Sequence, residues 1–108
     1  MKNGIFLKNI IIGLYRKNQI GVDCPANEII AKEIICRVAS NVLELRFSNN
    51  RSTPDAPAGC YWRVEGFSYF NRITDPSKTN PDEFNHKGGV CINIGKCYKR
   101  RTINSFII

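Results

Sequence analysis

The chain has 108 residues, of which 43% are apolar, and this length supports one domain with a modest core. No apolar run approaches the roughly 18 residues of a membrane-spanning helix, so the sequence argues against an integral membrane protein. The formal net charge is +7, but residues 24–91 contain equal numbers of basic and acidic side chains, so the excess charge lies in the two ends.

The N-terminal segment, residues 1–23, begins like a secretory signal, with Lys2 near the start and an apolar stretch after it. Lys8 and Asn9 interrupt that stretch, and no small-residue cleavage site follows cleanly. A terminal strand or helix packed on the domain explains the same pattern, so both interpretations stay open at this point.

Residues 27–43 have helical spacing, with Asn27 as a candidate N-cap. Apolar side chains fill most of the helix circumference, and so wide an arc predicts a helix covered on more than one side. The remaining polar stripe consists of Glu33, Arg37, Ser40 and Glu44.

After this helix, residues 43–47 alternate and predict a short strand. The cluster of polar residues and prolines from Ser48 to Pro57 predicts a loop. Asn50-Arg51-Ser52 in that loop is a formal N-glycosylation triplet, a pattern that is common by chance.

Two aromatic runs flank Glu65-Gly66 and predict a β-hairpin with a two-residue turn. In that register Trp62 faces Tyr69. Alternation then defines one face, which we expect to be core, formed by Cys60, Trp62, Val64, Phe67 and Tyr69. The opposite face carries Tyr61, Arg63, Ser68 and Phe70.

A polar loop follows the hairpin at residues 74–82, and Gly88-Gly89 is expected to break the chain before a closing strand at residues 90–94. The sequence therefore predicts the α+β class, with one helix on a small antiparallel sheet of three to four strands. The module spans residues 24–94, and residues 95–108 form a basic C-terminal tail.

The chain contains five cysteines, which is dense enough to suggest an oxidising compartment and a disulfide framework with one thiol left over. Reduced, buried cysteines are the alternative. No C-x-x-C or C-x-x-H pair occurs, and the acidic residues of the 74–83 region lack calcium-loop spacing, so we expect no metal and no cofactor.

The cysteines and the segments between them resemble a small cysteine-bearing module that recurs in predicted proteins of algae and other protists. The resemblance covers residues 24–91, and its most specific part is Pro57-Ala58-Gly59-Cys60-Tyr61 followed by Tyr69-Phe70-Asn71. The module often occurs beside extracellular or membrane-anchored domains, so the resemblance implies a location at or outside the cell surface. It implies no reaction.

Four of the cysteines belong to this resemblance, and four cysteines allow three pairings. We predict that one disulfide joins Cys36 to Cys60, linking the helix to the hairpin. The other joins Cys24 to Cys91 and closes the two ends of the module. Cys97 lies outside the four-cysteine pattern.

Catalysis is not expected, because no acid, base and nucleophile converge in a recognisable motif. His86 is the only histidine. A dyad of His86 with Cys91 or Cys97 is the alternative that the sequence leaves open.

The favoured function is non-catalytic binding of a glycan or protein, with Tyr61, Arg63 and Phe70 as the candidate ligand-binding surface. The alternative is binding of nucleic acid or an anionic surface through the basic tail. The basic patch in that tail consists of Lys96, Lys99, Arg100 and Arg101.

Overall fold

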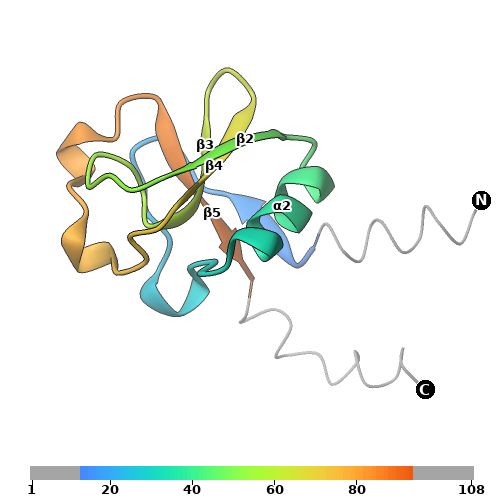
Figure 1. Cartoon of the computed structure of the whole chain (residues 1–108), viewed down its shortest axis with the longest axis horizontal. Helices are drawn as coiled ribbons and strands as arrows, with labels where there is room; N and C mark the ends of the chain where they lie inside the picture. Colours follow the sequence, from blue (N-terminus) through green and yellow to red (C-terminus); the bar gives the residue numbers. More distant parts are fainter. Residues whose placement is uncertain (1–12, 94–108) are drawn as a thin grey trace, which may run out of the picture.

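A mixed β-sheet organises the chain, and a single α-helix packs on one of its faces within the part of the chain that the structure describes (Figure 1). The computed structural model describes residues 13–93. The strand order is β1-β5-β3-β4-β2. The elements are β1 (Tyr15–Lys17), η1 (Ala26–Glu28), α2 (Glu33–Val42), β2 (Arg46–Arg51), β3 (Gly59–Arg63), β4 (Phe67–Asn71), η2 (Pro76–Lys78), η3 (Pro81–Glu83) and β5 (Lys87–Ile92).

The α+β class is confirmed, but the expectation of a purely antiparallel sheet is wrong. Strand β2 pairs in parallel with β4, whereas the other pairs are antiparallel. The sheet also has five strands in the described range instead of three to four. The predicted short strand at residues 43–47 is present but shifted, because β2 begins where that strand was expected to end and continues into the predicted loop. The additional strand is β1, which lies inside the N-terminal segment, where a terminal strand was one of the open interpretations.

The helix is shorter than predicted, because α2 begins at Glu33 and not at Asn27. Cys24 is bonded to Cys91, and Ile29 forms a bridge with the same residue of β5. These contacts hold the chain against the sheet just where the helical spacing begins. Tertiary contacts therefore override the local helical pattern.

Helix α2 ends in a Schellman motif, in which the Leu45 amide donates to the Ser40 carbonyl at 2.8 Å. Glu44 occupies the left-handed position at φ 61°, where glycine is the usual residue. This turn directs the chain into β2.

The β3–β4 hairpin differs from the prediction by one residue of register. Cys60 pairs with Phe70 and Tyr61 pairs with Tyr69, so the loop contains three residues, Val64 to Gly66. A one-residue slip moves every side chain of a strand to the other face. Phe67 and Tyr69 therefore lie on the face opposite Cys60, and the prediction that they share its face is wrong.

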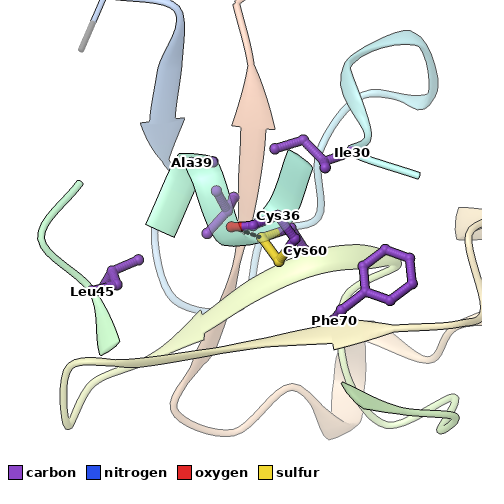
Figure 2. Close-up of a cluster of buried hydrophobic side chains, with 7 residues drawn as sticks. Ile30, Cys36, Ala39, Leu45, Cys60 and Phe70 are labelled. Carbon is purple, nitrogen blue, oxygen red and sulfur yellow. Dashed lines mark hydrogen bonds between the residues drawn. A yellow bond between two sulfur atoms is a disulfide. The ribbon is translucent and has the colours of Figure 1, made fainter. Parts of the chain in front are cut away.

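The hydrophobic core lies between α2 and the sheet, around the Cys36–Cys60 disulfide (Figure 2). Both sulfurs belong to fully buried residues. Ser40, which the sequence placed on the polar stripe, is 1% exposed, and its hydroxyl lies 2.6 Å from that of Ser68. The buried core residues are Ile30, Cys36, Ala39, Leu45, Cys60, Phe70 and Val90.

The outer side of α2 is apolar and exposed in the described structure. Ile34 is 63% exposed and Val38 is 44% exposed. Within residues 13–93, therefore, α2 is covered on one side only, and the expected second cover is not seen.

The second disulfide, Cys24–Cys91, lies on the face of the sheet away from α2. Gly89 pairs with Tyr61, and a Cβ atom on Gly89 would lie 2.8 Å from the Cys24 sulfur. Both disulfides match the predicted pairing. The two disulfides therefore attach chain segments to opposite faces of the sheet.

Gly88 and Gly89 were expected to break the chain, yet both are buried residues of β5. A Cβ on Gly88 would lie 2.6 Å from the Gln19 carbonyl oxygen, so the absence of a side chain allows the chain after β1 to cross closely. Gly89 provides the same clearance for the Cys24–Cys91 disulfide.

We expect Gly89→Ala to impair formation of the Cys24–Cys91 disulfide, because its methyl group would contact both the sulfur and the backbone nitrogen of Cys24, the latter at 3.1 Å. The number of free thiols, counted by intact mass after alkylation without reduction, should rise by two relative to the wild type. Gly66→Ala is the control, since it meets no atom within 4 Å although its φ of 100° makes it strained. An unchanged thiol count in Gly89→Ala would contradict the steric argument.

Candidate functional site

The sheet face away from α2 is partly covered by loops that two polar side chains hold in place. Asn71 is fully buried, and its amide nitrogen donates to the carbonyls of Thr53 at 2.7 Å and Pro57 at 3.0 Å. Asp23 accepts hydrogen bonds from the Ala58 amide at 3.2 Å and the Thr79 hydroxyl at 3.1 Å. These hydrogen bonds hold the loops over the part of the sheet face where Asn71 lies.

The β2–β4 side of the same face carries a cluster of arginine and aromatic residues that are not fully covered. We call it the arginine–aromatic face, and it consists of Arg46, Arg51, Arg63, Phe67 and Tyr69. All five side chains are exposed or half-buried. The register places Arg46 beside Phe67 and, further along β2, Arg51 beside Asn71.

Aromatic stacking orders this face. The rings of Tyr61 and Tyr69 are stacked, with centroids 5.3 Å apart and planes inclined by 16°. The Arg51 guanidinium lies 5.2 Å from the Tyr69 ring centre, and that of Arg46 lies 5.8 Å from the Phe67 ring centre. The cations therefore lie directly over the aromatic side chains.

The arginines of this face have little compensating negative charge. Glu65 accepts a hydrogen bond from the Arg63 Nε at 3.2 Å. Among residues 13–93, the guanidinium groups of Arg46 and Arg51 make no hydrogen bond or ion pair. A segment that is neutral in the sequence thus presents a locally basic surface in the structure.

Tyr61 lies beneath this cluster and is 1% exposed. Burial raises the pKa of its hydroxyl to about 12, with smaller opposing effects of Arg51 and Arg63, so the group keeps its proton at neutral pH. Both arginines lie on the same face of the sheet as Tyr61. Its oxygen has no hydrogen-bond partner among the residues that the structure describes.

The residues predicted as a ligand-binding surface do not form one exposed face. Phe70 is 7% exposed and packs in the core under α2, so its predicted exposure is wrong. Tyr61 faces the other side with Arg63 but is buried, so it cannot offer its ring to solvent. Only Arg63 lies where the prediction needs it. The basic patch Lys96, Lys99, Arg100 and Arg101 lies outside the described residues, as does Cys97.

Four of the five residues of the arginine–aromatic face were missed by sequence reasoning. Phe67 and Tyr69 were assigned to the core through the register error described above. Arg46 and Arg51 are five positions apart, so strict alternation would place them on opposite faces. A register shift between Phe47 and Asn49 adds one residue to β2 and brings both arginines to the same face. No signal in the sequence marks this bulge.

Other candidate chemistry is limited in the described part of the chain. Cys91 is bonded to Cys24, so it cannot serve as the thiol of a dyad with His86. No group of three potential metal-ligating side chains is found among residues 13–93. Within the same range, no helix combines the length and apolar character needed to cross a membrane.

No protein-family model matches the chain, and neither curated proteins nor solved structures yield a match. The arginine–aromatic face is the feature of the described residues that bears most directly on function.

Asp23 provides a pH test of the loop attachment, because burial raises the pKa of its carboxyl above the ordinary value of 3.8. The folded protein then binds this proton more tightly than the unfolded chain, so the stability that Asp23 contributes is lost as pH rises from 3.8 through the folded pKa. We expect Asp23→Asn to gain in free energy of unfolding relative to the wild type over that pH rise, measured by urea denaturation.

Asp75→Asn is the control with the opposite sign. Hydrogen bonds from the Ser77 amide and hydroxyl lower the pKa of the Asp75 carboxyl. The free energy of unfolding of Asp75→Asn should therefore fall relative to that of the wild type as pH rises. If Asp23→Asn followed the same direction as Asp75→Asn, the burial argument for Asp23 would fail.

Proposed function

We propose that this chain is a non-catalytic binding module that binds a glycan at or outside the cell surface. The observation that carries the proposal is the arginine–aromatic face, where Phe67 and Tyr69 are half-buried on strands while α2 occupies the other side of the sheet. Aromatic rings can stack on the apolar faces of sugar rings, and guanidinium groups can donate several hydrogen bonds to hydroxyl or acidic groups.

The proposed location is supported by the two disulfides. Disulfides form and persist in secreted and extracellular proteins and are rare in the cytosol. Both bonds join segments that are far apart in the sequence, with separations of 67 and 24 residues. A small domain that is held together in this way suits an oxidising environment.

Binding of single-stranded nucleic acid is the second candidate function. The sequence directed this alternative to the C-terminal tail, but the described structure offers a different surface, in which three arginines surround two partly exposed rings. Bases stack on aromatic rings while cations neutralise phosphates. Such binding weakens steeply with added salt, whereas binding of a neutral glycan does not.

A glycan screen followed by calorimetry on the full chain tests the proposed function. We expect Phe67→Ala to weaken binding of the selected glycan about tenfold, as is typical of an aromatic side chain at the centre of a binding surface. Ile34→Ala is the matched control, because Ile34 is an exposed apolar side chain on α2. Equal losses of affinity in the two variants would contradict the proposal that the arginine–aromatic face is the binding surface. A screen in which no glycan binds would contradict the proposal that the ligand is a glycan.

The proposed location has its own test. Protein isolated from its natural source and alkylated without reduction should carry one modified cysteine of the five, since two disulfides occupy four of them. Intact mass spectrometry counts the modified thiols directly. Five modified cysteines would place the natural protein in a reducing compartment and would overturn the extracellular proposal.

A further inference from the structure

We propose that the arginine–aromatic face contains a subsite for a tetrahedral oxyanion, formed by Arg51, Arg63 and the hydroxyl of Tyr61. The ligand is then an acidic glycan that carries sulfate groups. This inference rests on the proposed function for the source of the oxyanion, but the anion subsite itself can be tested independently.

The hydroxyl of Tyr61 is buried and unsatisfied within the described residues. The residue is 1% exposed, and its oxygen has no hydrogen-bond partner among residues 13–93. Buried polar groups in folded proteins nearly always have a partner, and an exception calls for an explanation such as an ordered water or a bound ion. An oxygen of a bound anion would accept a hydrogen bond from this hydroxyl.

The hydroxyl of Tyr61 is a neutral O–H donor. A tyrosine keeps its proton at neutral pH even at its ordinary pKa of 10, and burial raises the pKa of Tyr61 further, to about 12. A phenolate would pair with the arginines itself and would repel an anion. A protonated tyrosine leaves the Arg51 guanidinium and the terminal nitrogens of Arg63 available to a ligand, while the Arg63 Nε stays paired with Glu65.

Arg51 and Arg63 have unused hydrogen-bond donors on the same face of the sheet as Tyr61. The Arg51 guanidinium makes no hydrogen bond within the described residues, and it lies 5.2 Å from the centre of the Tyr69 ring. Arg63 uses its Nε for Glu65 at 3.2 Å, and its terminal nitrogens make no hydrogen bond within residues 13–93. Arginine nitrogens in a planar fork match the oxygens of sulfate or phosphate.

The neighbouring residues suggest how a sugar chain would continue from the subsite. Arg46 lies beside Phe67, which precedes Tyr69 by two positions on β4 and so shares its face. Adjacent strands are about 4.8 Å apart, so Arg46 on β2 and Arg63 on β3, with β4 between them, are separated by about 10 Å across the sheet. A sugar ring on Phe67 could therefore carry acidic groups toward both arginines.

The test begins with inorganic sulfate, titrated against the full chain and followed by the side-chain N–H signals of the arginines in an NMR spectrum. The same protein is then titrated with a sulfated oligosaccharide, with its desulfated form and with a single-stranded oligonucleotide. We expect sulfate to shift the signals of Arg51 and Arg63, and the sulfated sugar to bind at least about tenfold more tightly than the desulfated one.

Tyr61→Phe separates a binding role from a structural one. Removing an unsatisfied buried hydroxyl should leave the melting temperature of the free protein unchanged or higher. The same change should weaken binding of the sulfated sugar about tenfold, since a hydrogen bond to a charged group is lost. A merely structural tyrosine would not give these two effects together.

Arg51→Gln should weaken binding of the sulfated sugar at least as much as Tyr61→Phe does, because it removes a positive charge as well as hydrogen-bond donors. Arg37→Gln is the matched control, since it removes the same charge from α2, where Arg37 pairs with Glu33. Equal losses for Arg51→Gln and Arg37→Gln would show that only the net charge matters and would overturn the subsite.

The outcomes distinguish the two proposals. If sulfate shifts the arginine signals but no glycan binds, the subsite stands and the glycan function fails. If the sulfated and desulfated sugars bind equally, and Tyr61→Phe binds as the wild type does, the glycan function stands and the subsite fails. Tighter binding of the oligonucleotide than of the sulfated sugar would overturn the sulfated glycan as the ligand.

Discussion

The fold depends on two disulfides that hold separate layers against opposite faces of one sheet. Cys36–Cys60 fixes α2 on one face, and Cys24–Cys91 fixes the segment before the helix on the other. From the lengths of the closed loops, the bonds contribute about 3.5 and about 4.4 kcal/mol by restricting the unfolded chain. Since a small domain is stable by only about 5–15 kcal/mol in total, oxidation accounts for a large part of the stability of this one.

The Cys24–Cys91 disulfide and the polar contacts near it determine which part of the sheet remains uncovered. The loops on the face away from α2 bury Ala56, Pro57 and Phe84, and they are held by Cys24–Cys91, Asn71 and Asp23 near one end of the strands. The β2–β4 side is left without such a cover. The arginine–aromatic face therefore consists of side chains on strands, and strands position their side chains more rigidly than loops do.

Much of the architecture could be predicted from the sequence, since the helix, the hairpin and both disulfides are present. The candidate site could not, because it depends on single-residue differences. The sequence is compatible both with a two-residue turn at Glu65-Gly66 and with the observed three-residue loop from Val64 to Gly66. The two loops place each β4 side chain on opposite faces of the sheet. The bulge in β2 depends on pairing with β4, whose partner residues lie 20 or 21 positions further along the chain. Local patterns carry no information about such pairing.

Charge shows most clearly why placement matters more than composition. Residues 24–91 are neutral in sum, but the parallel pairing of β2 with β4, together with the bulge, gathers Arg46 and Arg51 on the face of Arg63. Gathering cations without carboxylates raises the free energy of the folded state, and here only Arg63 has an acidic partner. The buried Tyr61 hydroxyl on the same face, which has no partner among the described residues, adds a further cost. A bound oxyanion would offset both costs at once, since it would accept the hydroxyl proton's hydrogen bond and neutralise the guanidinium groups.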